Sequence, residues 1–274
     1  CNGTDTVVVV VHQLPLVEAG SNAQVCINDT IELVATGAET YVWSPLDSIS
    51  NVNNDSVRVW PTDTSTYFVQ GTDIFGCVNV DIVDVIVNSL PIVYAGPDVQ
   101  ICIEDSIQLI ATGGTDYTWS PSDSLSNTKN DTVWAYPADT SVYYVIVADS
   151  NGCIGSDSLV VTVNPFPVID VGSAHQICIG DVTTLSAAGG ESYIWNSTDT
   201  VSLASNDTIE VSPNDTTTYY VEVSDSNNCV SYDSVIVTVN PLPIIIVGLD
   251  VQICLYDSVQ LIVSGAELYS WLTI

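Results

Sequence analysis

The stretch DSLVVTVNP at residues 157–165 decides the fold, because an apolar residue stands at every second position from Leu159 through Val161 to Val163. This period of two is the signal of a β-strand with one buried face. The same stretch returns as DIVDVIVNS at 81–89 and as DSVIVTVNP at 233–241. The alternation persists while the residues between vary, so we expect one face of this strand to be core and the other to tolerate change.

The chain repeats itself with a step of 76 residues and without insertion or deletion. Each repeat carries a first cysteine, a tryptophan 17 residues later and a second cysteine near its end. The first cysteines are Cys26, Cys102, Cys178 and Cys254, the second cysteines are Cys1, Cys77, Cys153 and Cys229, and the tryptophans are Trp43, Trp119, Trp195 and Trp271. Self-similarity at this period is typical of a tandem array of small units.

We place the repeat boundaries at the Leu-Pro or Phe-Pro step. This predicts complete repeats at 14–89, 90–165 and 166–241, with the last strand of a preceding repeat at 1–13 and a truncated repeat at 242–274. Each connection contains proline, and proline restricts its own φ as well as the residue before it. Successive repeats are therefore expected to hold a semi-rigid, extended relation.

Short apolar runs with the strand period recur within each repeat. In the first complete repeat they lie at 31–35, 41–43, 56–60 and 67–69, and clusters of Asn, Asp, Ser and Gly separate them. Strands with turn signals about every 8 to 12 residues are typical of a β-sandwich. No segment shows a helical period. The sequence thus predicts an all-β chain of tandem sandwiches in an extended array.

The composition narrows the classes of function. Aspartate and glutamate number 33 against only Arg58 and Lys129, which gives a net charge of −31. Nucleic acid needs a basic face to release counterions, so it is excluded as a partner. No apolar run is long enough to insert into a membrane. Eight cysteines without histidine at metal-ligand spacing favour disulfides and hence an oxidising, extracellular compartment. Because the chain opens inside the repeat and shows no signal peptide, we expect it to belong to a longer polypeptide.

Four stretches of the second complete repeat carry a family likeness. They are AGPDVQICIEDSIQLIATGG at 95–114, YTWSP at 117–121, VYYVIVADSNGC at 142–153 and DSLVVTVNP at 157–165. Together they resemble the PKD-like and Ig-like repeats of giant secreted or cell-surface proteins of the Bacteroidota, of the type associated with gliding motility and type IX secretion. The likeness covers essentially the whole chain. It implies seven-strand sandwiches, secretion, a spacer or adhesive role and no enzymatic activity.

The cysteine spacing alone leaves the disulfide pairing open. One alternative joins cysteines across a boundary, as Cys77 to Cys102, and uses all eight. The resemblance to self-contained family repeats favours a bond within each repeat, and a domain of this size is marginal without one. The favoured pairs are Cys26–Cys77, Cys102–Cys153 and Cys178–Cys229, with Cys1 and Cys254 paired to residues outside this sequence.

Tryptophan and aspartate also recur in the repeats and are candidates for a structural or binding role. The four tryptophans are expected to be core residues, with sugar stacking as the weaker alternative. Recurrent aspartates are expected to start turns and to keep the surface soluble. Calcium at Asp73, Asp149 and Asp225 is a weaker alternative, since no run matches an EF-hand loop. No resident metal and no cofactor are expected.

Serine or threonine often follows aspartate and precedes an apolar residue or threonine. This pattern resembles the O-glycosylation signal of secreted Bacteroidota proteins, and sugar at strand starts would shield sheet edges. The candidate acceptors are Thr6, Thr30, Ser48, Ser56, Ser106, Ser124, Thr132, Ser158, Thr200, Thr208, Thr216, Ser234 and Ser258.

These observations support a structural protein that forms a rod, stalk or extracellular filament from disulfide-bonded, O-glycosylated sandwiches. Its expected partners are neighbouring repeats and other copies of itself, and its expected location is extracellular or on the cell surface. Two alternatives are an adhesin that binds glycans or other surfaces through its loops, and a spacer region of a secreted enzyme. No set of residues suggests a catalytic site within the chain.

Overall fold

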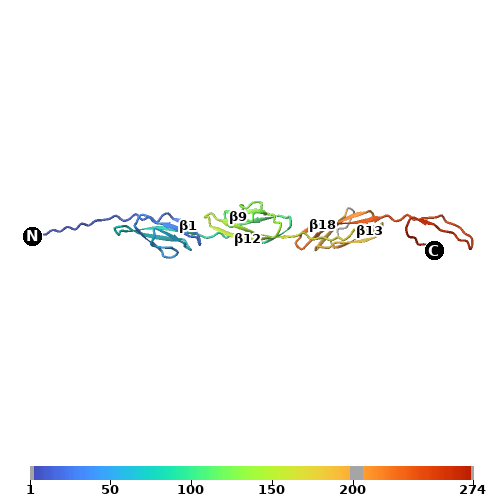
Figure 1. Ribbon diagram of the computed structural model, residues 1–274, viewed down its shortest axis with the longest axis horizontal. Coiled ribbons are helices and arrows are strands. Elements are labelled where there is room, and N and C mark those ends of the chain that lie inside the picture. Colours follow the sequence, from blue (N-terminus) through green and yellow to red (C-terminus); the bar gives the residue numbers. More distant parts are fainter. Residues whose placement is uncertain (1–2, 198–205, 273–274) are drawn as a thin grey trace. The chain divides into compact units, whose positions relative to one another are not determined.

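The computed structural model describes residues 3–197 and 206–272, and the regular structure of these residues consists of β-strands (Figure 1). The first complete repeat holds β1 Ala23–Cys26, β2 Ile31–Val34, β3 Thr40–Ser44, β4 Ser56–Val59, β5 Ser65–Thr72 and β6 Val78–Asn88. The second holds β7 Val99–Cys102, β8 Ile107–Ile110, β9 Asp116–Ser120, β10 Thr132–Ala135, β11 Ser141–Ala148 and β12 Ile154–Asn164. The third holds β13 His175–Cys178, β14 Thr183–Ser186, β15 Ser192–Ser197, β16 Thr208–Val211, β17 Thr217–Ser224 and β18 Val230–Asn240, and a short pair follows at β19 Ile246–Val247 and β20 Val263–Ser264.

Each complete repeat is a sandwich of a four-stranded and a two-stranded sheet. In the first repeat the larger sheet has the order β1-β6-β5-β3 and the smaller one pairs β2 with β4. The strands β5 and β6 form an antiparallel pair, whereas β1 runs parallel to β6 with Cys26 opposite Asn88. This parallel pair brings Cys26 to the end of the repeat at which the chain leaves for the next one.

The core of each repeat lies between its two sheets. Strand β5 alternates between buried and exposed residues, as the period of two predicts. Trp43 is fully buried against Tyr67 and the surrounding valines, and its indole Nε1–H donates to the carbonyl oxygen of Asn54 at 3.0 Å. Trp119 and Trp195 are buried in the same way and donate to the equivalent carbonyls at 3.0 and 3.1 Å.

Two expectations differ from the observed elements. The family resemblance implies seven strands for each sandwich, but six form within the described residues of each, because the segment before each first cysteine makes only an isolated bridge, such as Glu18 to Thr36. Residues 3–13, expected to be the last strand of another repeat, form no strand, since no described strand lies beside them to accept their backbone hydrogen bonds. The expectation that Trp271 is a core residue is wrong: it is 56% exposed, because the described part of the truncated repeat forms only the short pair β19 and β20 and no second sheet that could cover it.

The chain divides into two compact units. One comprises residues 1–99 and 105–162, and the other comprises residues 100–104 and 163–274. The second unit thus includes the end of β7, which precedes it in sequence by some sixty residues. The predicted repeat boundaries remain a proposal.

Candidate functional site: disulfide-bonded junctions between repeats

Two disulfides each bond the first cysteine of one repeat to the second cysteine of the next. Cys26 bonds Cys153 and Cys102 bonds Cys229, with a sequence separation of 127 residues and Cα atoms 5.6 Å apart in both. We call each bond, with the strand end and the loop that carry it, a junction.

The observed bonds show that both pairings considered from the sequence are wrong. The favoured pairs Cys26–Cys77, Cys102–Cys153 and Cys178–Cys229 do not form, and neither does Cys77–Cys102. The thiols of Cys77, Cys178 and Cys254 are free, and Cys1 lies outside the described residues.

The length of β6 explains why a repeat cannot bond its own two cysteines. Cys77 directly precedes β6, whereas Cys26 lies opposite Asn88 at its other end. An eleven-residue strand spans about 35 Å at roughly 3.3 Å per residue. A disulfide needs Cα atoms within about 7 Å. The two cysteines of one repeat therefore lie at opposite ends of it, and each faces a neighbouring repeat instead.

An aspartate organises the loop that carries each second cysteine. In the loop Asp149–Cys153 the Oδ1 of Asp149 accepts the backbone N–H of Asn151 at 2.8 Å and that of Cys153 at 2.9 Å. Asp225 accepts the N–H of Asn227 and of Cys229 at 2.9 Å each. These hydrogen bonds hold the pKa of Asp225 below its ordinary value, and the bond from the N–H of Cys229 has the largest effect. The carboxylates thus shape the loop and direct the cysteine.

The same geometry is found at Asp73, the third candidate calcium residue. Asp73 accepts the N–H of Phe75 and of Cys77 at 2.9 and 2.8 Å, so all three candidate calcium residues are loop-shaping residues. Within residues 3–197 and 206–272, no group of three or more His, Cys, Asp or Glu side chains is arranged to hold a metal ion.

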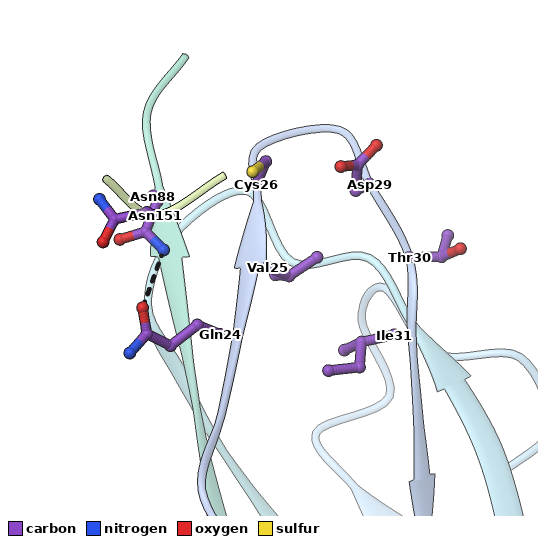
Figure 2. Close-up of a pocket in the computed structure, with 8 residues that line it drawn as sticks. All are labelled: Gln24, Val25, Cys26, Asp29, Thr30, Ile31, Asn88 and Asn151. Carbon is purple, nitrogen blue, oxygen red and sulfur yellow. Dashed lines mark hydrogen bonds between the residues drawn. The ribbon is translucent and has the colours of Figure 1, made fainter. Parts of the chain in front are cut away.

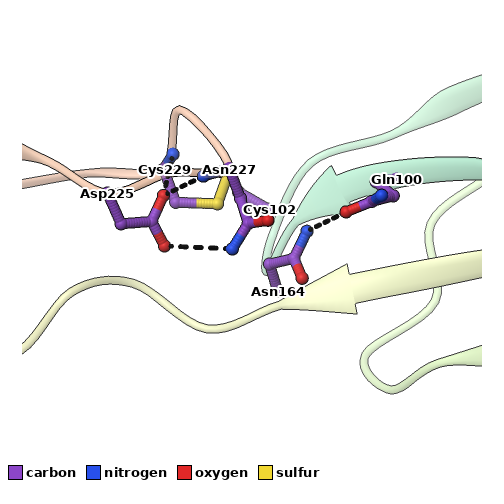
Figure 3. The surroundings of a disulfide bond; sticks show 6 residues. All are labelled: Gln100, Cys102, Asn164, Asp225, Asn227 and Cys229. Atoms are coloured by element: carbon purple, nitrogen blue, oxygen red, sulfur yellow. Dashed lines mark hydrogen bonds between the residues drawn. A yellow bond between two sulfur atoms is a disulfide. The ribbon is translucent and has the colours of Figure 1, made fainter. Parts of the chain in front are cut away.

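The second junction is shown in Figure 3. The carboxylate of Asp225 lies beside the bond between Cys102 and Cys229, and its Oδ2 accepts the side-chain amide of Asn227 at 3.4 Å. On the strand side, the amide of Asn164 donates to Oε1 of Gln100 at 3.3 Å. Amide and carboxylate groups thus frame the disulfide on both sides.

A shallow polar groove of about 350 Å³ lies beside the first junction (Figure 2). Asn88 donates to Gln24 across the parallel strands at 3.2 Å, and Asn151 approaches from the loop of the following repeat. Asp29 and Thr30 line the groove, and the candidate acceptor Thr30 is exposed there.

A ring stack occupies the equivalent place before the first repeat. The rings of His12 and Phe75 stack with centroids 3.8 Å apart and an interplanar angle of 11°. One repeat step later the same two positions are Asn88 and Asn151, which line the groove of the first junction. The segment before the first repeat therefore meets the loop 73–77 as Asn88 meets the loop 149–153.

The candidate acceptors are spread over the repeats rather than gathered at one site. Those with exposed side chains are Thr6, Thr30, Ser106, Ser158, Thr208, Thr216, Ser234 and Ser258. Those that are half-buried are Ser48, Ser56, Ser124 and Thr132. Ser56 donates to Glu32 at 2.5 Å and Ser124 bonds the hydroxyl of Tyr143 at 2.5 Å, so these two hydroxyls are already engaged. Thr200 lies outside the described residues.

Comparison with known proteins agrees with the fold. Residues 165–241 match the family model of an Ig-like domain described as CHU_C associated. No curated protein matches the chain. This match and the sheets of the three complete repeats show repeated Ig-like β-sandwiches.

Several of the similar solved structures are tandem Ig domains. Sidekick-1 immunoglobulin domains 1-5 share 13% identity over 84% of this chain, with a TM-score of 0.32, and this chain spans 60% of that structure. Dpr2 Ig1-Ig2 in complex with DIP-Theta Ig1-Ig3 shares 15% identity over 83% of this chain and all of that one, with a TM-score of 0.33. The I9-I11 tandem of titin shares 12% identity over 83% of this chain and all of that one, with a TM-score of 0.34. Because these TM-scores are below 0.5, the likenesses carry no argument about this chain.

Tandem Ig-like domains with two disulfides indicate an extracellular repeat region of structural or adhesive type. Within the described part of the chain, no helix is long and apolar enough to cross a membrane.

Proposed function

We propose that this chain is the structural region of a secreted or cell-surface protein, a rod, stalk or filament body in which each repeat is bonded to the next. The observation that supports this function is the pairing of Cys26 with Cys153 and of Cys102 with Cys229. A proline-containing connection constrains a junction at one point. The disulfide adds a second point, and two links resist bending and twisting better than one.

Small-angle X-ray scattering tests this proposal. The native chain is expected to give a narrow distribution of long end-to-end distances. A variant with Cys26, Cys153, Cys102 and Cys229 all replaced by serine should give a broader and shorter distribution. The matched control, Cys77→Ser with Cys178→Ser, removes only free thiols and should scatter like the native chain. A native distribution as broad as that of the four-site variant would contradict a stiff array.

We also propose that the surface carries O-linked sugar, above all at Ser158 and Ser234. Both are exposed, and each lies directly opposite an exposed tyrosine, Ser158 opposite Tyr144 and Ser234 opposite Tyr220. Directly paired residues share one face of a sheet at about 5 Å, so a sugar on the serine can lie over the tyrosine ring. Intact mass before and after chemical deglycosylation checks this, and a native mass equal to that of the bare polypeptide would exclude it.

The alternative is an adhesin, and one observation favours it. Phe68, Tyr144 and Tyr220 occupy one column of the repeat and are 44%, 54% and 51% exposed on the outer face of the larger sheet. Exposed aromatic rings that recur on one sheet face suit a binding surface for neutral sugar. Replacing all three by serine should abolish binding to an insoluble polysaccharide such as cellulose, whereas Trp134→Ser, an exposed aromatic outside this column, should not. Native protein that does not bind removes this alternative.

We propose neighbouring repeats and other copies of the chain as partners, export by the type IX route, no resident cofactor and no catalytic activity. If the chain is instead the spacer of a secreted enzyme, the junctions would serve the same mechanical purpose.

A further inference from the structure

Cys178 lies in a strand end that has the geometry of a bonded junction. It sits opposite Asn240 in the parallel pair of β13 and β18, as Cys26 sits opposite Asn88. The next residue, Ile179, donates its N–H to the carbonyl of Asn240 at 2.9 Å, and Ile27 does the same to Asn88 at 2.9 Å.

The turn after the cysteine is also the same. Asp181 donates its N–H to the carbonyl of Cys178 at 3.0 Å, as Asp29 does to that of Cys26 at 3.0 Å. The Cys178 side chain is exposed and its thiol is free. The strand end is thus fully formed without a bond.

The loop half of a junction keeps its shape without a bond as well. Asp73 accepts the N–H of Cys77 at 2.8 Å and donates its own N–H to the carbonyl of Cys77 at 3.0 Å. The bonded loops show the corresponding pairs, at 2.9 and 3.0 Å in the loop Asp149–Cys153. Bonded Cys153 and Cys229 are completely buried, whereas free Cys77 is half-buried.

We propose that Cys178 is the open half of a third junction and that its partner is the thiol of an Asp-x-x-x-Cys loop, the loop type at 149–153 and 225–229. The loop that carries this thiol belongs to a further repeat that follows the third one. The loop 73–77 of a second copy of the chain would offer the same thiol chemistry. The inference rests on the proposed function and deepens it, since it makes the junction a module that accepts successive repeats.

Closing this junction is an oxidation. The sulfur atoms of Cys178 and of the loop cysteine form one S–S bond and together lose two protons and two electrons. A small-molecule disulfide such as oxidised glutathione takes up the electrons and protons, its own S–S bond breaks, and two thiols leave. Cys254 provides a control within the chain, because it is exposed and free but lies in no described strand.

Inserting one repeat tests the proposal on the full chain. A duplicate of residues 166–241, placed after residue 241, keeps the 76-residue step and adds one complete Asp-x-x-x-Cys loop. After refolding with oxidised glutathione and alkylation of free thiols, peptide mapping should link Cys178 to the inserted loop cysteine. Cys254 should remain alkylated, and the free first cysteine should move to the inserted repeat. Replacing the inserted loop cysteine by serine should return Cys178 to the alkylated pool.

Two results would overturn the proposal: Cys178 that stays alkylated in the inserted chain, or Cys178 that bonds Cys254 as often as the loop cysteine. A mixture of ¹⁴N- and ¹⁵N-labelled chains identifies the source of the partner, since a mixed-isotope Cys178–Cys77 peptide arises only between copies. Bond mapping reports nothing about stiffness, so a failure here is distinct from a failure of the scattering experiment.

Discussion

At the scale of the residue, one packing position shows how a repeat adapts its core. In the second repeat a Cβ at Gly114 would overlap the side chain of Val147 and the backbone of Ala148. In the first repeat the corresponding residues are Ala38 and Gly71, so the larger and the smaller side chain have changed places. A Cβ at Gly71 would meet Ala38 at 2.7 Å. The two positions therefore share one volume.

This exchange predicts a favourable coupling between two substitutions. Gly114→Ala alone should destabilise the chain by about 1–3 kcal/mol, because overpacking forces backbone and side chains apart. In a Val147→Gly background the same change should cost clearly less, since the first repeat accommodates that combination. Urea unfolding of the four members of this cycle measures the coupling. Equal costs of Gly114→Ala in both backgrounds would show that the two sites are independent.

The loop carboxylate of Asp225 predicts a dependence on pH. Hydrogen bonds from Cys229 and Asn227 lower its pKa in the folded chain, so its contribution to stability is fully present above the ordinary value of 3.8 and is lost as the pH falls through the lowered value. Asp225→Asn keeps an oxygen acceptor but cannot titrate. The difference in unfolding free energy between native and variant chains, measured by urea from pH 7 to about pH 2.5, should therefore shrink below about pH 3.8. A constant difference would mean that the carboxylate charge does not stabilise the loop.

At the scale of the element, the strands could be predicted from the sequence and the junctions could not. The alternation from Leu159 to Val163 identifies β12, and the tryptophan column identifies the core, because both depend on local burial. The parallel pairing of β1 with β6 joins segments some sixty residues apart and leaves no local signal. Without knowledge of that pairing, Cys26 and Cys77 could be expected to form one disulfide within the repeat. The sequence pattern at 81–89 does not show that the strand begins at Val78, and the resulting eleven-residue length of β6 separates the two cysteines.

Glycine recurs at one position of each repeat, and the sequence shows this position but not why glycine is needed there. Gly37, Gly113 and Gly189 recur with the 76-residue step. Each has a positive φ, at 91°, 124° and 110°, and a Cβ there would overlap the carbonyl oxygen of the segment that leads into the repeat. The reason for glycine is thus a close approach of two backbones, which only the folded chain brings together.

The distribution of basic residues allows the disulfide pairing to be checked with one protease. Trypsin can cleave only after Arg58 and Lys129, which gives fragments 1–58, 59–129 and 130–274. The observed bonds tie the first and second fragments to the third. In denaturant without reductant, Cys77→Ser should therefore keep all three fragments together, whereas Cys153→Ser should release fragment 1–58. Release of that fragment from Cys77→Ser would instead support the bond within a repeat.

At the scale of the whole molecule, the two disulfides form overlapping closed loops, 26–153 and 102–229. Every peptide bond between Cys26 and Cys229 lies within at least one of them. A single cleavage in this region therefore leaves the fragments covalently joined. In a chain with a net charge of −31, self-repulsion favours extension, and covalent closure at each junction opposes separation of the repeats.

The closed loops also predict how much each bond contributes to stability. Closing 127 residues in the unfolded chain contributes about 5 kcal/mol in the chain-entropy model, and domains of this size are marginal alone. Replacing Cys26 and Cys153 together by serine should thus lower the midpoint of thermal unfolding of residues 14–165 by roughly 10–20 °C, at about 2–4 °C per kcal/mol. Differential scanning calorimetry measures this, with Cys178→Ser as the control that removes a thiol but no bond. If both variants unfold at the native temperature, the bond holds the repeats together without stabilising their fold.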